Sequence, residues 1–527
     1  MKPLSFIALS LVILTSSLGG SGSLPDSRGW YTFHHENVLG TSFELKIAAA
    51  NQAAARKGEA AALAEIERQA KILSAYDPQS EFSRWMRTSG QAVTVSAELF
   101  EVLGLFDQWR ERSGGALDAS AEAVGRVWKA AGAAQRLPSD TEIAAAVASV
   151  RRRHWRLDAG ARTATHLSDT PLALNSFAKS YIVGHAADAV LRAGSVTAVV
   201  VNIGGDLVVR GAWAEAVNIA DPLADAENSA PIAQLLVRDR AVATSGNYRR
   251  GVRIGDRFYS HIVDPRTGQP VDRVISSTVV AADPAEAGAL ATAFSVLTPQ
   301  ESRRLAAGLP GVEYLLVERN GNRLESAGWH ALEAPQSGMA PGFTPGFAQG
   351  LAAKPAAVVA GPAADQAGPS GAAWDASFEL TINLELARLN GMRARRPYVA
   401  AWIEDKDKFP LRTIGLWFNK TRWLPELRAW NRDDRMRAMA EGNDIAASVS
   451  SATRPPGRYT LKWDGKDNAG KSVRPGKYTV CIEVAREHGS HQIIRQEMEF
   501  AGVPKQVQLA PNEEVAGASL DYARKVH

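Results

Sequence analysis

The sequence has one cysteine, Cys481, among 527 residues. A single cysteine cannot form an internal disulfide, and metal clusters built from cysteines are excluded as well. Cys481 lies in an apolar, strand-like run, which favours a buried structural thiol over a catalytic one. The cores of this protein must therefore be held by packing alone.

An excess of charge of one sign is also missing. The formal net charge is only +4, and no dense Lys/Arg tract with interleaved aromatic residues occurs, so no nucleic-acid binding is expected. Hydrophobic residues make up 45% of the chain and charged residues 22%, which is enough for large cores. At this length the chain should contain two or three domains.

The apolar run at the N-terminus is short. Lys2 precedes "PLSFIALSLVIL" (3–14), and small residues follow at 15–23. This pattern is typical of a secretory signal peptide and is too short for a confident membrane span. There is no twin arginine and no cysteine near the cleavage region. We therefore expect a Sec-type signal peptide over 1–23, a periplasmic or otherwise exported protein, and no lipoprotein anchor.

A stretch rich in Ala, Pro, Gly and Ser divides the chain. Residues 334–372 show no sustained periodicity and are predicted to be a linker. Before them, 28–333 mixes helical patterns with strand patterns in an α+β order without regular alternation. After them, 375–503 contains short runs of period two separated by turns, which predicts a small Ig-like antiparallel β-sandwich. Residues 504–527 are predicted to form a tail.

Within the α+β part the helices and strands can be placed more closely. Helices are expected over 53–75 and 97–112, and "SDTE" (139–142) is a capping box that opens another. Asn175 is expected to cap a helix that ends near Gly194. "VTAVVVNIGGDLVVRG" (196–211) predicts two strands joined across a Gly-Gly turn, and 275–283 a strand before a helix that starts at Pro284.

Four loops carry more polar groups than simple turns need: "LNSFAKSY" (174–181), "NIGGDL" (202–207), "ATSGNYRRG" (243–251) and "YSHIVDPRTGQP" (259–270). Each has a plain structural interpretation. Lys179 could be an exposed helical lysine or, near a helix N-terminus, part of an anion site. The glycines could only turn the chain, and His261 could be a satisfied structural histidine or a proton acceptor.

Taken in this order, the four loops resemble the ApbE family of FAD:protein FMN transferases. "VLGTSFEL" (38–45), "LSAYDPQSEFSR" (73–84) and "GGALDAS" (114–120) are similar to further family motifs, so the resemblance covers roughly 28–333. It implies an exported α+β domain that binds FAD as a substrate and uses Mg²⁺. It also implies transfer of FMN to a threonine or serine hydroxyl of a target flavoprotein, with release of AMP.

The resemblance also implies roles for individual residues. Lys179 and His261 would be catalytic, with His261 near the proton transfer from the attacking hydroxyl. The loop at 244–246 would lie near the active site, and Ser176 and Thr292 would be metal-site positions. The flavin nucleotide would contact Leu39, Tyr76, Asp118, Lys179, His261 and Ile262.

The sequence departs from the family pattern at the metal site. In "AEAGALATAFSVL" (285–297) the position of the family's metal-binding aspartate is Gly288, and loss of that carboxylate should weaken binding of Mg²⁺. Asp283 and Glu286 are better explained as a helix cap. We expect Gly288→Asp to raise metal affinity. Three further departures are Ala173 and Gly184 at aspartate positions and Ser180 at a glycine position.

These departures leave a second interpretation open, a flavin-binding pseudoenzyme without transferase activity. A third concerns the C-terminal part, which resembles an uncharacterised periplasmic domain found beside ApbE-type sequences. Its tryptophans could form a binding face or could pack its core. In that interpretation the β-sandwich binds an envelope partner, and isolated 375–503 should retain the partner.

Overall fold

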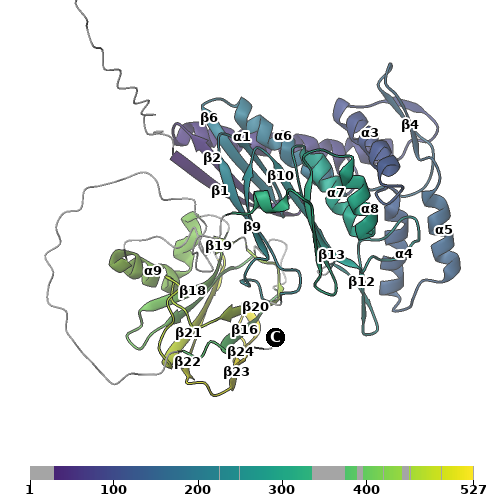
Figure 1. The fold of residues 1–527 in the computed structure, drawn as a ribbon. Coiled ribbons are helices and arrows are strands. Elements are labelled where there is room, and N and C mark those ends of the chain that lie inside the picture. The colour runs from purple at the N-terminus through teal and green to yellow at the C-terminus, as the bar shows by residue number, and fades with distance from the viewer. Residues whose placement is uncertain are drawn as a thin grey trace, which may run out of the picture.

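The computed structural model describes residues 29–224, 226–247, 250–334, 374–388, 396–418, 421–441, 450–451, 453–487 and 489–525. The predicted signal peptide and nearly all of the predicted linker lie outside these ranges. The described residues form a mixed N-terminal domain and a β-rich C-terminal domain (Figure 1). None of the helices within these ranges is long and apolar enough to cross a membrane.

The N-terminal domain is built on one eight-stranded sheet in which every neighbouring pair is antiparallel. Such a sheet, formed without βαβ crossovers, confirms the predicted α+β class. In spatial order the strands are β1 (Gly29–Val38), β2 (Thr41–Ala49), β6 (Val196–Ile203), β7 (Asp206–Gly211), β10 (Ala241–Gly246), β13 (Val274–Ala281), β14 (Glu313–Glu318) and β15 (Arg323–Glu325).

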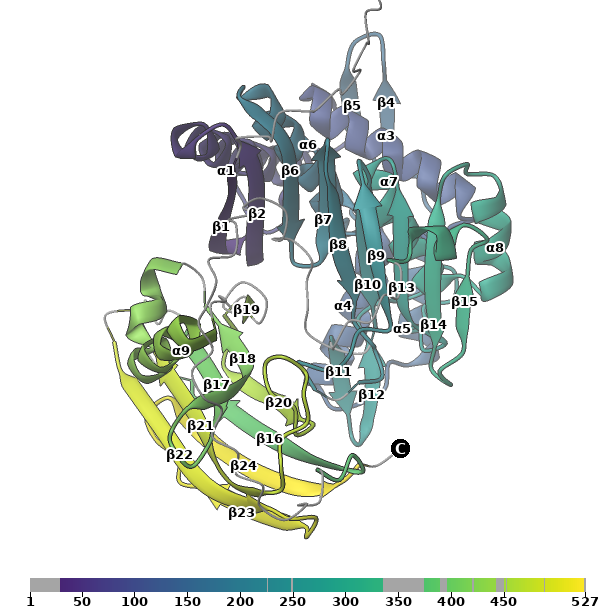
Figure 2. The same cartoon turned by 60° about the vertical axis from the view of Figure 1, so that its left-hand side comes forward.

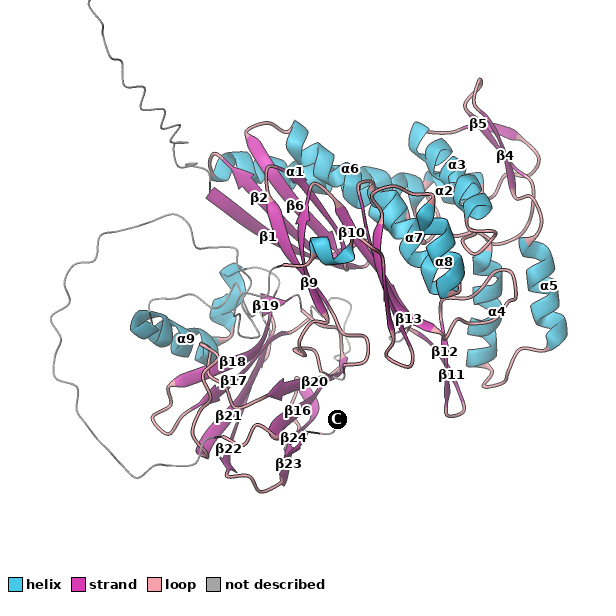
Figure 3. Cartoon of the chain, viewed as in Figure 1, coloured by secondary structure: helices cyan, strands magenta, loops and turns pink. Residues whose placement is uncertain are grey.

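Helices cover one face of this sheet (Figure 3). Their apolar side chains and those of the sheet form the largest core of the domain. The opposite face packs on the hairpin of β8 (Ala214–Ile219) and β9 (Ala233–Arg238) and on the short helix η1 (Trp329–Leu332). The helices are α1 (Gln52–Leu73), α2 (Glu81–Trp85), α3 (Ala97–Arg112), α4 (Ala121–Ala133), α5 (Asp140–Val150), α6 (Ala178–Arg192), α7 (Pro284–Val296) and α8 (Pro299–Ala307).

Two small sheets complete the domain. One has the order β3 (Ala92–Thr94), β5 (Thr163–His166), β4 (Trp155–Asp158), and the other is the hairpin of β11 (Gly251–Ile254) and β12 (Arg257–Ser260). The expected helices over 53–75 and 97–112 and the capping box of Ser139 with Glu142 are confirmed. The expected cap at Asn175 is wrong, because α6 begins at Ala178 with Phe177 as its N-cap.

The C-terminal domain is a sandwich of two sheets that share one core. One sheet has the order β20 (Gly457–Trp463), β16 (Phe378–Leu386), β24 (Val515–Arg524), β23 (Lys505–Leu509). The other has the order β19 (Ser450–Ser451), β18 (Pro410–Trp417), β17 (Tyr398–Glu404), β21 (Gly476–Ala485), β22 (His491–Phe500). The short helix η2 (Thr421–Glu426) and helix α9 (Arg428–Glu441) belong to the same domain (Figure 2).

The tryptophans of this domain lie in its cores. Trp402, Trp417, Trp430 and Trp463 are each at most 2% exposed, so they pack the domain and do not form a binding face. Cys481 is buried on β21, as predicted for a structural thiol, and burial raises the pKa of that thiol.

The predicted tail at 504–527 is wrong. Residues 505–509 and 515–524 are strands, and β24 lies between β16 and β23 with buried Ala518, Leu520 and Tyr522 on its inner face. The alternation of apolar residues along 515–524 was the signal for this strand. The domain therefore extends to about residue 525, and isolated 375–503 would lack an internal strand of one sheet.

Candidate functional site

Three of the predicted loops, 174–181, 202–207 and 243–251, meet near the start of helix α6, through the contacts of Lys179 with Gly204 and of Thr292 with Ser176 and Ser245. Lys179 is the second residue of α6, and no side chain among the described residues caps the N-terminus of that helix. Free N–H groups at a helix N-terminus beside an ammonium favour an anion. The structure therefore places Lys179 near a helix N-terminus, and the binding of an anion there remains a prediction.

Lys179 reaches across to the Gly-Gly turn between β6 and β7. Its Nζ donates to the carbonyl of Gly204 at 3.1 Å and lies 3.3 Å from a carboxylate oxygen of Asp206. Asp206 is buried, which raises its pKa, while the charge of Lys179 and a hydrogen bond from Ser180 act in the opposite direction. An ammonium has three hydrogens, so one of them remains for a ligand.

The first hairpin of the domain touches the same turn. Leu39 and Gly40 form the tight β1–β2 connection with φ of 49° and 78°, and the Thr41 side chain follows them. A Cβ on Gly204 would lie 2.6 Å from that side chain, so only glycine allows the two turns to approach this closely. The hairpin that carries Leu39 is thus placed beside the turn that receives Lys179.

Oxygen atoms from three elements gather near the start of α6. The Thr292 hydroxyl on α7 donates to the Ser176 carbonyl at 3.0 Å, and the Ser245 hydroxyl on β10 lies 3.4 Å from the Thr292 hydroxyl. The structure therefore brings together the two predicted metal-site residues. Thr244, next along β10, bonds instead to Thr278 of β13 at 2.9 Å.

Helices α6 and α7 approach each other through glycines. A Cβ on Gly288 would lie 2.3 Å from Oγ and 2.8 Å from Cβ of Ser180, and a Cβ on Gly184 would lie 2.8 Å from the Pro284 ring. Ser180 therefore fills the space that any side chain at 288 would need. The expectation for Gly288→Asp is corrected accordingly, because the single substitution cannot be accommodated unless Ser180 moves.

These donors do not fit a magnesium ion that is held by protein carboxylates. Mg²⁺ is usually bound through one or two carboxylates in addition to substrate phosphates, whereas Ser176, Thr292 and Ser245 offer only neutral oxygens. Among the described residues no group of three or more His, Cys, Asp and Glu side chains could hold a metal ion. Asp206 touches the neighbouring Ser180 but is already paired with Lys179.

Asp283 and Glu286 do not replace the missing carboxylate. The Asp283 side chain accepts from the backbone N–H of Glu286 at 2.7 Å and caps α7, as the sequence indicates. Desolvation raises the pKa of Glu286, and the charge of Asp283 adds to this effect. Glu286 is two positions from Gly288, so it faces a different side of the helix.

His261 follows directly after β12 and is exposed. Its Nδ1 lies 3.0 Å from the carbonyl of Arg250, and since a carbonyl only accepts, Nδ1 carries the hydrogen and Nε2 the lone pair. Partial desolvation lowers the pKa of His261, as does the positive charge of Arg250, while the carbonyl contact partly offsets them. At neutral pH the ring is therefore a neutral proton acceptor.

The rest of the "HIVDPRTGQP" loop is fixed by structural contacts. Asp264 forms an ion pair with Arg266 at 2.9 Å, and Arg266 also reaches Glu301 on α8 at 3.2 Å. Gly268, with φ of 74°, accepts a hydrogen bond from the Trp128 ring at 2.8 Å. The proline, glycine and charged residues of this motif thus hold the loop, and the His261 side chain at its start keeps Nε2 available.

Asp118 and Ile262 have structural surroundings as well. Asp118 is 4% exposed, and its carboxylate accepts from Ser120 at 2.6 Å and pairs with Arg110 at 2.9 Å. Ile262 donates its backbone N–H to Ser260 at 3.0 Å and is partly buried. The predicted flavin contacts of both residues remain predictions.

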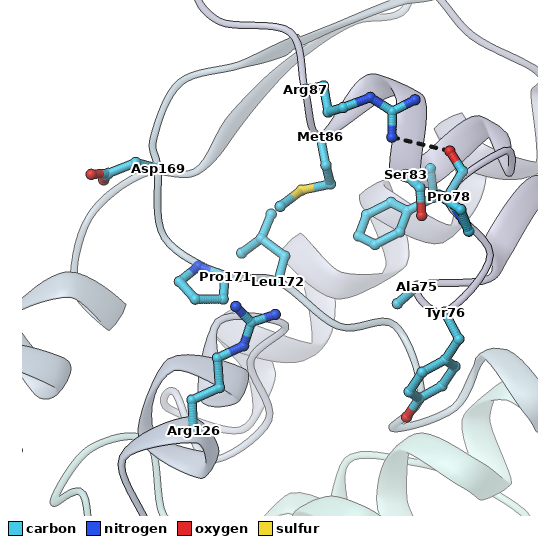
Figure 4. A pocket seen from close by; sticks show the side chains of 11 residues that line it. Ala75, Tyr76, Pro78, Ser83, Met86, Arg87, Arg126, Asp169, Pro171 and Leu172 are labelled. Atoms are coloured by element: carbon cyan, nitrogen blue, oxygen red, sulfur yellow. Dashed lines mark hydrogen bonds between the residues drawn. The ribbon is translucent and has the colours of Figure 1, made fainter. Parts of the chain in front are cut away.

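Tyr76 lines a pocket of about 390 Å³ between the 75–87 segment, α4 and the loop before α6 (Figure 4). Its ring is 85% exposed, which is unusual for an aromatic side chain. Apolar groups of Phe82, Met86 and Leu172 line the same pocket, together with Arg126. An exposed aromatic ring beside an apolar wall is suited to stacking on a planar ligand.

Two polar residues of these sites, Asp206 and Arg126, are not singled out by the sequence, and a third, Ser245, is predicted only as part of its loop. Asp206 stands in the quoted "NIGGDL" stretch, but its pairing with Lys179 depends on two segments that only the fold brings together. Ser245 was expected only near the active site, and its contact with Thr292 again needs the tertiary structure. Arg126 lines the Tyr76 pocket and sits in an ordinary helical pattern that gives no signal of a site.

Both domains match known protein families. A model of the ApbE family matches residues 39–316, and a model described as a predicted periplasmic protein (DUF2271) matches 379–517. An FAD:protein FMN transferase of Treponema pallidum is 28% identical over 317 residues, which cover 56% of this chain and 86% of the relative. One from Klebsiella pneumoniae is 25% identical over 310 residues, or 57% and 86% of the two chains.

A solved structure has the same fold as the N-terminal domain. The crystal structure of the ApbE protein from Thermotoga maritima superposes with a TM-score of 0.52 at 25% identity, over 58% of this chain and all of that one. The shared region corresponds to the domain that carries Lys179 and His261.

Proposed function

This chain belongs to the ApbE family, and we propose that it is an exported FAD:protein FMN transferase. In the proposed reaction a Thr or Ser hydroxyl of a target flavoprotein attacks the phosphorus on the FMN side of FAD. A new P–O bond forms to the acceptor, the bond to the AMP phosphate breaks, and AMP leaves with the bridging oxygen. The observation that carries this proposal is the contact of Lys179 with the Gly204 turn at an uncapped helix N-terminus.

Lys179 is proposed to bind the pyrophosphate. A pyrophosphate carries dense negative charge, and more of it develops on the leaving AMP oxygen during transfer. The N–H groups that begin α6 and the remaining Lys179 hydrogen would stabilise that charge. Asp206 acts through the lysine, because its buried carboxylate fixes the ammonium beside the turn.

His261 is proposed to take the proton from the attacking hydroxyl. A histidine that acts as a general base must be deprotonated at working pH and must present a lone pair, and both conditions agree with the lowered pKa and with the Nδ1 contact with Arg250. The Tyr76 pocket is proposed to hold a planar ring of FAD, and Leu39, Asp118 and Ile262 remain further candidate contacts.

In this proposal the protein itself binds Mg²⁺ only weakly. Ser176 and Thr292 are the positions that would touch the ion, and they supply neutral oxygens without a carboxylate. When bound, Mg²⁺ would neutralise phosphate charge, and its retention would depend on the phosphates of FAD more than on the protein.

A second candidate function is favoured by the contact of Ser180 with Gly288. If no ion is retained there, the chain could bind FAD without transferring FMN. The two functions differ in their products. Incubation with FAD and an exported flavoprotein acceptor gives a covalent flavin on the acceptor and an equal amount of AMP in the first case. In the second case FAD is bound and recovered intact.

The location and the partners are proposed on similar grounds. The match of 379–517 to a predicted periplasmic family and the signal-like N-terminus both support export to the periplasm. The acceptor flavoprotein would meet the enzyme there. An additional envelope partner of the β-sandwich is a separate proposal that the transfer assay does not test.

A further inference from the structure

Strand β20 lies at the edge of its sheet and pairs on one side only, with β16. The other side of an edge strand presents backbone N–H and C=O groups that need partners. Alternate residues of an antiparallel strand direct these groups to the same side. On β20 the outward groups belong to Thr460 and Lys462.

The loop between β8 and β9 of the N-terminal domain supplies the partners. The backbone N–H of Glu227 donates to the carbonyl of Thr460 at 2.8 Å. The carboxamide of Asn228 donates to the carbonyl of Lys462 at 2.6 Å and accepts from its N–H at 2.8 Å. Asn228 thus satisfies both backbone groups of one residue, as a neighbouring strand would.

Charged and aromatic side chains also contact one another around these hydrogen bonds. Arg454 of the sandwich pairs with Glu227 at 3.0 Å, and the Arg454 guanidinium lies 5.4 Å from the centre of the Trp417 ring. At a separate point His34 of β1 meets Phe418 with ring centres 6.0 Å apart. The two domains therefore touch through an ion pair and an aromatic pair in addition to the backbone hydrogen bonds.

We infer that the β-sandwich is docked in cis on the N-terminal domain, with Glu227 and Asn228 taking the place of a strand beside β20. The domains then behave as one body in spite of the long segment between them, and the β20 edge is closed to strands of other proteins. This inference does not depend on the transferase activity.

The test cuts the connection in the full chain. A specific protease site is inserted within 340–370, the purified protein is cleaved, and its mass is measured by size-exclusion chromatography with light scattering. The two pieces are expected to elute together at the mass of one chain. Separate elution of the wild-type pieces would overturn the inference, and so would a dimer whose β20 contacts come from a second copy.

Variants then locate the contact. Asn228→Ala removes both carboxamide hydrogen bonds and should weaken the association of the cut pieces by about tenfold or more. Asn218→Ala is the matched control, because among the described residues its side chain bonds to Gln234 alone, within the β8–β9 hairpin. Equal affinities for the two variants would contradict the proposed role of Asn228.

Exchanging the charges of Glu227 and Arg454 separates loss of the ion pair from a folding defect, because a second substitution can restore only the ion pair. Glu227→Arg and Arg454→Glu should each weaken the association, and the double variant should recover part of it, because the ion pair is restored in reverse. A double variant weaker than both single variants would show that this pair does not hold the domains together.

Discussion

The contact between Ser180 and Gly288 predicts that, in a double-mutant cycle, Gly288→Ala has opposite effects on the free energy of unfolding with and without the Ser180 side chain. Gly288→Ala places a Cβ 2.3 Å from the Ser180 Oγ, and overpacking of this kind costs about 1–3 kcal/mol. Alanine in place of glycine inside a helix returns up to about 1 kcal/mol. Gly288→Ala should therefore destabilise the wild-type chain, and it should stabilise the Ser180→Gly chain, in which the overlap with Ser180 is gone and the nearest remaining neighbour of the new Cβ is the Phe177 Cβ at 3.2 Å.

The hydrogen bond from Ser180 to Asp206 is lost in both chains that carry the Ser180→Gly substitution, so its loss cancels in the cycle. The coupling that remains equals the overlap, which corresponds to about 2–6 °C in the melting temperature of the N-terminal domain. Thermal unfolding of the four proteins measures it. Additive effects, or a Gly288→Ala variant as stable as wild type, would refute the close approach of α6 and α7.

The same cycle tests the metal site with aspartate in place of alanine. Gly288→Asp alone should destabilise the protein and gain no magnesium dependence. Ser180→Gly with Gly288→Asp should fold, and millimolar Mg²⁺ should raise its melting temperature, because a ligand that binds only the folded state stabilises it. A magnesium-dependent shift in the single variant would contradict the role given to Ser180.

Three further predictions concern single residues. His261→Gln should lower the rate of transfer by about 10²–10⁴-fold and leave FAD affinity nearly unchanged. In the wild type the rate should fall with decreasing pH at a midpoint below about 6.5, since the lowered pKa of His261 keeps its ring neutral to more acidic pH. A midpoint above that value would contradict the role given to His261. Tyr76→Ala should weaken FAD binding about 5- to 100-fold, as loss of stacking does, which calorimetric titration with FAD measures. Its melting temperature should not change, because Tyr76 is 85% exposed, and thermal unfolding checks this. Asp118→Ala should cost about 1–3 kcal/mol of stability without any ligand, because the buried N–H and hydroxyl of Ser120 lose their acceptor; an unchanged melting temperature would instead favour a role limited to flavin binding.

The sequence was sufficient for the elements whose signals are local. The capping box at Ser139, the Gly-Gly turn before Asp206 and the helix that starts at Pro284 all depend on neighbours within a few residues, and all were predicted. The strand at 515–524 was not predicted, although its alternation of apolar residues is a local signal. Helix α9 within the sandwich was not predicted either.

The chemistry of the site was predictable only in part. Lys179 and His261 stand in motifs that point to them directly. The filling of the space beside Gly288 by Ser180 could not be predicted, because it depends on how closely two helices pack. The same is true of the Asn228 contact, since a loop and a strand more than 200 residues apart meet only in the folded chain.

The central claim is that this protein moves FMN from FAD to an acceptor. The most direct test incubates the mature protein with FAD, Mg²⁺ and an exported flavoprotein acceptor, and measures covalent flavin by in-gel fluorescence and mass together with free AMP. We expect labelled acceptor and AMP in equal amounts, with both lost in the His261→Gln variant. Bound FAD with neither AMP nor labelled acceptor, repeated with a second acceptor, would contradict it.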